Sequence, residues 1–174
     1  EPLGIERSDD DLIFLYTGGT TGMPKGVMWS HRIWRESSRQ SMVSIYGFAP
    51  ENMAEHIAFT HEVGKHGRQL PACPLMHGTG LFTAMGSIIS GGCIVTLQNT
   101  KTFDPEELWE TVSRRGVTAM AIVGDAFAKP MLRVLNENPG KYDLSSVQTI
   151  TSSGVMWSME VKRGLIEHMP QVAL

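Results

Sequence analysis

Short apolar runs alternate with helix-length segments through most of the chain, and this alternation constrains the fold. Each pair of apolar runs is separated by one segment with helical signals, which is the spacing of βαβ units. The pattern therefore predicts an α/β fold with a largely parallel sheet and helices on both faces. From residue 68 onward we predict strands at 68–74, 93–97, 117–123 and 147–153, and helices at 78–92, 104–116, from about 125, and 158–169.

The beginning of the chain has a strand followed by a glycine-rich loop. Residues 12–17, L-I-F-L-Y-T, form a short apolar run of β-formers, which predicts a buried strand. The loop at 18–26 reads G-G-T-T-G-M-P-K-G, and the chain can resume an extended path at 27–29. A strand that runs directly into such a loop is a typical setting for a ligand-binding turn.

A helix and a polar segment follow the loop. Ser30 is predicted to cap a helix that ends at Gly47. Residues 48–68 are polar, and we interpret them as an irregular surface excursion. The excursion contains three histidines, His56, His61 and His66, whose spacing matches no common zinc pattern, so we interpret them as solvated loop residues.

Charge and cysteine content exclude several classes of protein. The chain has 15 basic and 18 acidic residues and a net charge of −3, so no basic field indicates a nucleic-acid partner. No apolar stretch reaches the ~20 residues of a transmembrane segment, and the acidic start is unlike a signal peptide. Two cysteines do not make a disulfide framework; we interpret Cys73 and Cys93 as small apolar core residues and predict a reduced, cytoplasmic location.

The loop at 18–26 carries the groups that bind phosphates. Its glycines allow the backbone to approach a ligand closely, and its hydroxyls, free N–H groups and Lys25 can contact phosphate oxygens. It is not a Walker A loop, because Pro24 precedes the lysine and Gly26 follows it. It lacks the G-x-G-x-x-G fingerprint of dinucleotide-binding proteins as well. The alternative interpretation is a hairpin turn rich in glycine and proline.

The sequence around this loop resembles a known signature. Residues 16–27, Y-T-G-G-T-T-G-M-P-K-G-V, resemble the Y-T-S-G-T-T-G-x-P-K-G-V motif of the adenylate-forming (AMP-binding) superfamily. This superfamily includes acyl-CoA synthetases, luciferases and the adenylation domains of peptide synthetases. The usual serine of the motif is Gly18 here, which removes one hydroxyl that would face the phosphates.

Three further segments resemble the same superfamily, in the family's order. Residues 73–81, C-P-L-M-H-G-T-G-L, resemble its P-L-F-H-x-x-G-L segment, which places His77 at the mouth of the acyl pocket. Residues 151–158, T-S-S-G-V-M-W-S, resemble the S-G-G-A-P-L-S segment that runs along the adenine and the acyl group. Residues 124–130, G-D-A-F-A-K-P, resemble bacterial fatty-acid and steroid side-chain CoA ligases.

The resemblance implies a reaction and a set of site residues. The family activates a carboxylic acid, here a fatty or steroid acid, with ATP and Mg²⁺ as acyl-AMP, and then transfers the acyl group to CoA. It implies catalytic roles for Lys25 and His77, and a contact to ATP-bound Mg²⁺ near Thr20 and Thr21. The implied nucleotide-binding residues are Thr17, Gly18, Gly19, Thr20, Thr21, Gly22, Lys25, Ser153, Gly154 and Val155.

The resemblance spans nearly the whole chain but covers only the middle of a family member. We therefore expect residues 1–174 to be a partial AMP-binding domain within the large N-terminal domain of an acyl-CoA synthetase. The family's later adenine-stacking, magnesium-binding and ribose-binding segments and its C-terminal lysine find no match here. We expect the isolated chain to be inactive, to need the remainder of the same enzyme, and to self-associate through exposed strand edges such as the apolar residues 171–174.

Two other functions fit the same motifs. An amino-acid adenylation domain usually carries an acidic residue near positions 77–82 to hold the α-amino group, and H-G-T-G-L-F contains none. A non-catalytic nucleotide-binding or interaction module that keeps only the fold is the other alternative.

Overall fold

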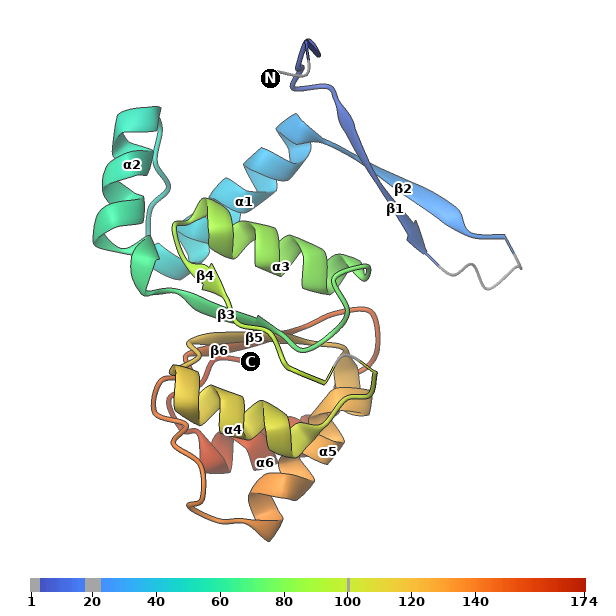
Figure 1. Cartoon of the computed structure of the whole chain (residues 1–174), viewed down its shortest axis with the longest axis vertical. Helices are drawn as coiled ribbons and strands as arrows, with labels where there is room; N and C mark the ends of the chain where they lie inside the picture. The colour runs from blue at the N-terminus through green and yellow to red at the C-terminus, as the bar shows by residue number, and fades with distance from the viewer. Residues whose placement is uncertain (1–3, 18–22, 100) are drawn as a thin grey trace. The chain divides into compact units, whose positions relative to one another are not determined.

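The computed structural model describes residues 4–17, 23–99 and 101–174 (Figure 1). The chain divides into two compact units, residues 1–55 and 56–174, and each is described by itself below. Within the described ranges, no helix is both long and apolar enough to cross a membrane.

The first unit contains an antiparallel hairpin and a long helix (Figure 1). Strand β1 (Leu12–Thr17) pairs with β2 (Lys25–Ser30), and α1 (His31–Tyr46) begins directly after β2. The Ser30 hydroxyl accepts a hydrogen bond from the Ile33 amide at 3.2 Å, and Gly47 ends the helix. The predicted strand, the extended path after the loop and the helix with both of its caps are confirmed.

The burial predicted for the first strand is wrong. Phe14 is 51% exposed and Tyr16 is 73% exposed, and no residue of β1 is buried. The physical reason is that β1 belongs to a two-stranded sheet, in which it pairs with β2 alone. A two-stranded sheet buries little of either face.

The irregular structure predicted at 48–68 is also wrong, because most of this segment is helical, although most of its residues are exposed as predicted. Helix α2 (Met53–Glu62) is followed by the 3-10 helix η1 (Gly64–His66). The Asn52 side chain accepts a hydrogen bond from the Glu55 amide at 3.0 Å, and Glu55 Oε2 accepts one from the Glu51 amide at 2.9 Å. This arrangement resembles a capping box, except that Glu55 binds the amide of the residue before Asn52, and the N-x-x-E spacing is its signal in the sequence.

The second unit is built on a four-stranded parallel sheet. Its strands are β3 (Arg68–Pro71), β4 (Cys93–Ile94), β5 (Ala119–Ile122) and β6 (Thr149–Ser152), in the order β4-β3-β5-β6. Each strand lies at its predicted place but is shorter than predicted.

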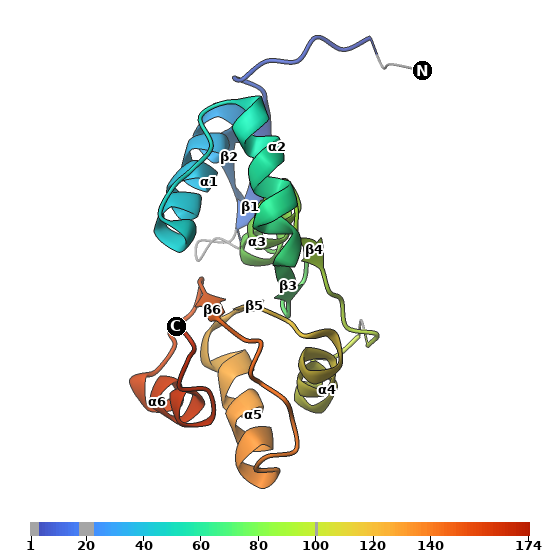
Figure 2. The same ribbon diagram turned by 90° about the vertical axis from the view of Figure 1, so that its left-hand side faces the viewer.

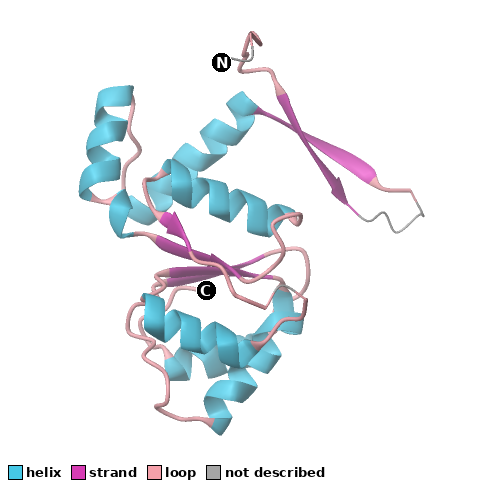
Figure 3. Cartoon of the chain, in the orientation of Figure 1, coloured by secondary structure: helices cyan, strands magenta, loops and turns pink. Residues whose placement is uncertain are grey.

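Helices cover both faces of this sheet (Figures 1, 2 and 3). Helix α3 (Gly78–Ile89) lies on one face. Helices α4 (Pro105–Arg115), α5 (Gly124–Glu137) and α6 (Met159–His168) lie on the other. The predicted α/β class, with a parallel sheet and helices on both faces, is confirmed.

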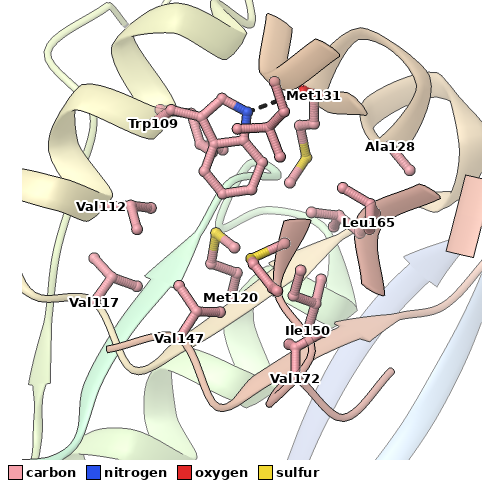
Figure 4. Close-up of a cluster of buried hydrophobic side chains, with 14 of the residues drawn as sticks. Trp109, Val112, Val117, Met120, Ala128, Met131, Val147, Ile150, Leu165 and Val172 are labelled. Atoms are coloured by element: carbon pink, nitrogen blue, oxygen red, sulfur yellow. Dashed lines mark hydrogen bonds between the residues drawn. The ribbon is translucent and has the colours of Figure 1, made fainter. Parts of the chain in front are cut away.

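The main core fills the space between the sheet and the helices α4, α5 and α6 (Figure 4). Trp109, Met120, Ile150 and Leu165 are fully or almost fully buried in it. The Trp109 indole N–H donates to the Met131 carbonyl at 3.0 Å, so this large side chain is buried without leaving its polar atom unpaired.

The end of the chain and the cysteines differ from expectation in part. Residues 171–174 pair beside β6 through one parallel bridge, Thr149 to Ala173, rather than as a strand.

Both cysteines are free; Cys73 is buried, and burial raises the pKa of its thiol. Cys93 is exposed, so its predicted place in the core is wrong: it begins β4, which pairs with β3 alone at the edge of the sheet.

Candidate active site

The strand order creates a natural binding place at the carboxyl ends of β3 and β5. From β3 the chain passes through α3 on one face, and from β5 it passes through α5 on the other face. The loops after these two neighbouring strands therefore leave the sheet in opposite directions. Parallel α/β sheets bind ligands at such a reversal, outside the carboxyl ends of the strands.

His77 lies at the end of the loop that follows β3. Its Nδ1 accepts a hydrogen bond from the Thr79 amide at 3.2 Å, so the side chain caps the N-terminus of α3. Because Nδ1 is an acceptor in this bond, the neutral ring carries its proton on Nε2. His77 is exposed, and its Nε2–H is therefore available as a hydrogen-bond donor.

The loop after β6 passes directly beside this ring. A Cβ atom built on Gly154 would lie 3.5 Å from both Cε1 and Nε2 of His77, and Gly154 has a φ of +86°. The Ser153 hydroxyl forms a hydrogen bond with the hydroxyl of Thr79, which is itself buried. The structure thus brings together three predicted site residues, His77, Ser153 and Gly154, and adds Thr79.

The start of α5 holds the same loop from its other side. The Asp125 amide donates to the Met156 carbonyl at 3.1 Å. Asp125 Oδ1 accepts hydrogen bonds from the Ser158 amide at 2.9 Å and from the Ser158 hydroxyl at 3.2 Å. The bond from the Ser158 amide is the main reason that the pKa of Asp125 is lowered, and the Lys129 ammonium, 3.3 Å from Oδ2, adds to it.

Apolar side chains are exposed on two of these loops. Met76, next to His77, is 89% exposed, and Met156 is 76% exposed. Val155, predicted to contact the nucleotide, is exposed as well. Flexible methionines beside a hydrogen-bond donor suit a ligand that has an apolar body and a polar end.

The first unit positions the two ends of the glycine-rich loop. Thr17 and Lys25 are opposite each other in the last strand pair before the loop, and the Thr17 hydroxyl donates to the Lys25 carbonyl at 3.4 Å. Both side chains are exposed. Five predicted binding residues lie outside the described part of the chain: Gly18, Gly19, Thr20, Thr21 and Gly22.

The described residues contain no group of three or more histidine, cysteine, aspartate or glutamate side chains that could hold a metal ion. His56 and His61 lie on α2 and His66 on η1, which corrects their interpretation as loop residues. His56 Nε2 lies 2.8 Å from the Ile89 carbonyl. The predicted contacts to Mg²⁺, Thr20 and Thr21, fall outside the described residues.

Sequence reasoning missed four residues of this site: Thr79, Gly124, Asp125 and Ser158. In the sequence, the segment at 124–130 indicates only a resemblance to one group of ligases. A more direct signal is that Gly124 and Asp125 follow a buried strand after one residue and begin a helix. Acidic residues in the first turn are favoured there by the helix dipole.

The fold, the site and the comparisons define the class of protein. Residues 2–174 match the AMP-binding enzyme family, and the chain belongs to that family. The match includes residues 16–27 in the first unit and the segments around His77 and Gly154 in the second.

Individual relatives are named as acyl-CoA ligases. The chain is 35% identical to the "Medium/long-chain-fatty-acid--CoA/3-oxocholest-4-en-26-oate--CoA ligase" of Mycobacterium marinum, over 95% of this chain and 29% of the relative. It is 34% identical to the "3-oxocholest-4-en-26-oate--CoA ligase" of Rhodococcus rhodochrous, over 95% of this chain and 30% of the relative. The chain thus spans less than a third of the length of these relatives.

A solved structure shows the same fold. The N-terminal domain of FACL13 from Mycobacterium tuberculosis superposes with a TM-score of 0.68 and 20% sequence identity. The match covers 99% of this chain and 37% of that one.

Proposed function

We propose that this chain is the middle portion of the large domain of an acyl-CoA ligase. The enzyme would activate a fatty or steroid carboxylic acid with ATP as acyl-AMP and transfer the acyl group to CoA. The observation that carries the proposal is the contact between the loops after β3 and β6, where His77 lies beside Gly154 within a chain of the AMP-binding family. The names of the relatives, which are ligases of fatty and steroid acids, support this substrate class.

The proposal assigns nucleotide contacts to two segments of the chain. Thr17, Lys25 and the backbone and hydroxyls of residues 18–22 would contact the phosphates, and residues 153–155 would line the nucleotide. Charge builds on the phosphate oxygens as the acid attacks the α-phosphorus, so the Lys25 ammonium would stabilise the transition state more than the ground state. Bound with ATP near Thr20 and Thr21, Mg²⁺ would neutralise part of the same charge.

The proposed acid site uses His77. Its Nε2–H would donate a hydrogen bond to the carboxylate and orient one oxygen toward the nucleotide, while the Thr79 amide keeps the ring in this orientation. The acyl body would lie against the exposed side chains of Met76 and Met156.

The state of Asp125 argues against an amino-acid substrate at this site. An α-amino group needs a free carboxylate, but both oxygens of Asp125 are already engaged by Ser158 and Lys129.

We also propose a cytoplasmic location, which two free cysteines support.

The test is ATP–pyrophosphate exchange by the full-length protein with a panel of fatty, steroid and amino acids. We expect exchange with fatty or steroid acids, followed by formation of acyl-CoA when CoA is added. The 174-residue chain should show no exchange above background. Exchange with amino acids alone would contradict the proposed substrate class, and binding of ATP without exchange would favour a non-catalytic module.

A further inference from the structure

The loop after β6 is fixed to the start of α5 at both of its ends. At one end, the Gly124 amide donates to the Ser152 hydroxyl at 2.8 Å. At the other end, Asp125 binds the Met156 carbonyl through its amide and Ser158 through its carboxylate. The intervening residues are the ones that pass beside His77.

At the end of the loop near Ser158, the contacts require a short side chain that accepts hydrogen bonds. One carboxylate oxygen of Asp125 receives both the amide and the hydroxyl of Ser158, and the other faces the Lys129 ammonium. The side chain is only 16% exposed. Hydrogen bonds to an ionised acceptor are stronger than neutral ones, so this carboxylate is a firm anchor for the loop.

The backbone leaves no room for the loop to settle closer to α5. A Cβ atom built on Gly124 would lie 2.5 Å from the Met156 carbonyl oxygen and 2.9 Å from that of Val155. The loop therefore packs directly on the helix start, and its distance from His77 depends on this contact. Release of the anchor would let the loop move away from the helix and change that distance.

We propose that Asp125 is a positioning residue: it holds residues 153–157 at the correct distance from His77 for the acid and the nucleotide to bind together. The proposal rests on the proposed function in one respect, which is that both substrates bind at this loop. Asp125 acts through Ser158 and the Met156 backbone and does not touch the substrates. It thereby sets where the exposed side chains of Val155 and Met156 are presented.

The chain contains a matched control for this anchor. Asp143 Oδ1 accepts hydrogen bonds from the Ser145 amide at 3.0 Å and from the Ser145 hydroxyl at 2.6 Å, which repeats the contact of Asp125 with Ser158. Asp143 lies in the segment between α5 and β6, before the strand rather than in the loop after it. Its removal takes away the same kind of interaction without reaching residues 153–157.

The experiment compares Asp125→Ala, Asp125→Asn and Asp143→Ala in the full-length protein. We expect Asp125→Ala to raise the KM for the acid and for ATP about tenfold, the effect of losing hydrogen bonds to a charged group, with a smaller change in kcat. Asp125→Asn keeps the Oδ1 acceptor and should remain within about threefold of wild type. Asp143→Ala should leave both KM values unchanged.

Hydrogen exchange of residues 152–158 in the same variants supplies a readout that needs no activity. We expect faster exchange of this peptide in Asp125→Ala and no change in Asp143→Ala. Equal exchange in wild type and Asp125→Ala would overturn the proposal, as would KM values for Asp125→Asn as poor as those for Asp125→Ala. If the wild-type protein forms no acyl-AMP, the proposed function fails, and the exchange data still decide whether Asp125 holds the loop.

Discussion

Strands β1 and β5 are both apolar, yet they have opposite environments. Met120, Ala121 and Ile122 in β5 are fully buried, whereas Phe14 and Tyr16 in β1 are more than half exposed. Strand β5 has a neighbour on each side and helices over the sheet, while β1 has one neighbour. An apolar run therefore predicts a strand, but the number of covering elements decides whether that strand is buried.

The two regions also differ in what they contribute. The sheet and helices of the second unit hold nearly all of the fully buried side chains. The hairpin of the first unit holds Thr17 and Lys25, for which we propose contacts to the phosphates. We therefore expect substitutions in the sheet core to reduce stability and substitutions in the hairpin to reduce activity.

The largest expected effect is on the core. Trp109→Ala should lower the free energy of unfolding by about 3–5 kcal/mol, because it leaves a large cavity and removes the hydrogen bond to Met131. The measurement is urea unfolding followed by circular dichroism. Trp109→Phe is the control, since it keeps most of the apolar volume and should cost clearly less. If Trp109→Ala lowered the free energy of unfolding by less than about 1 kcal/mol, the expectation that the sheet core determines stability would be wrong.

The next largest effect is expected on the rate of the reaction, when Lys25 of the hairpin is replaced. In the full-length protein, Lys25→Ala should lower the rate of adenylation about 10²–10³-fold, the usual loss for one group that stabilises developing charge. The KM for the acid should change much less, and the unfolding midpoint should stay close to wild type because the side chain is exposed. A change in the KM for the acid alone would show that Lys25 has a different role.

Much of the fold followed from local signals in the sequence. Asp104, Pro105 and Gly116 mark α4 correctly because capping, the fixed φ of proline and the glycine stop are local effects. Helix α2 was missed because its capping box at Asn52 and Glu55 lies within a polar segment. The exposure of Phe14 could not be predicted, since it depends on which elements cover the hairpin.

The site was predictable only where a motif carried it. His77 and Gly154 were found by resemblance, and their proximity follows from the strand order, which local patterns do not determine. The contact of Asp125 with Ser158 joins residues 33 positions apart. No periodicity or spacing in the sequence indicates such a pair, so it needed the structure.

Helix caps provide a smaller and matched test of the two units. Asp104 Oδ1 accepts hydrogen bonds from the Glu106 amide at 2.9 Å and the Glu107 amide at 3.3 Å, whereas Ser30 caps α1 through one bond at 3.2 Å. Asp104→Ala should cost about 1–2 kcal/mol of unfolding free energy and Ser30→Ala about 0.5–1 kcal/mol. The reverse order in urea unfolding would show that the hairpin unit contributes more to stability than its burial indicates.

A still smaller effect should appear in the pH dependence of stability. Hydrogen bonds to the Asp143 carboxylate from the Ser145 hydroxyl, the larger cause, and from the Ser145 amide lower the pKa of Asp143. A carboxyl with a lowered pKa in the folded state stabilises the protein above its unfolded pKa of about 3.9, and this contribution disappears as the pH falls through the folded value. The difference in the free energy of unfolding between wild type and Asp143→Asn should therefore shrink as the pH falls from 6 to 2. A difference in unfolding free energy that grows as the pH falls would contradict the lowered pKa of Asp143.

The smallest expected effect is at the exposed face of the hairpin. Phe14→Ser in the 174-residue chain should change the free energy of unfolding by less than about 0.5 kcal/mol, because a side chain that is half exposed loses little burial when it is removed. Phe14 shares its face with Leu12 and Tyr16, and such a face favours contact with another apolar surface. Light scattering at micromolar concentration should therefore show less self-association for Phe14→Ser than for wild type. A loss of stability comparable to that of Trp109→Ala would mean that β1 is as well covered as β5, and the contrast between the two strands would fail.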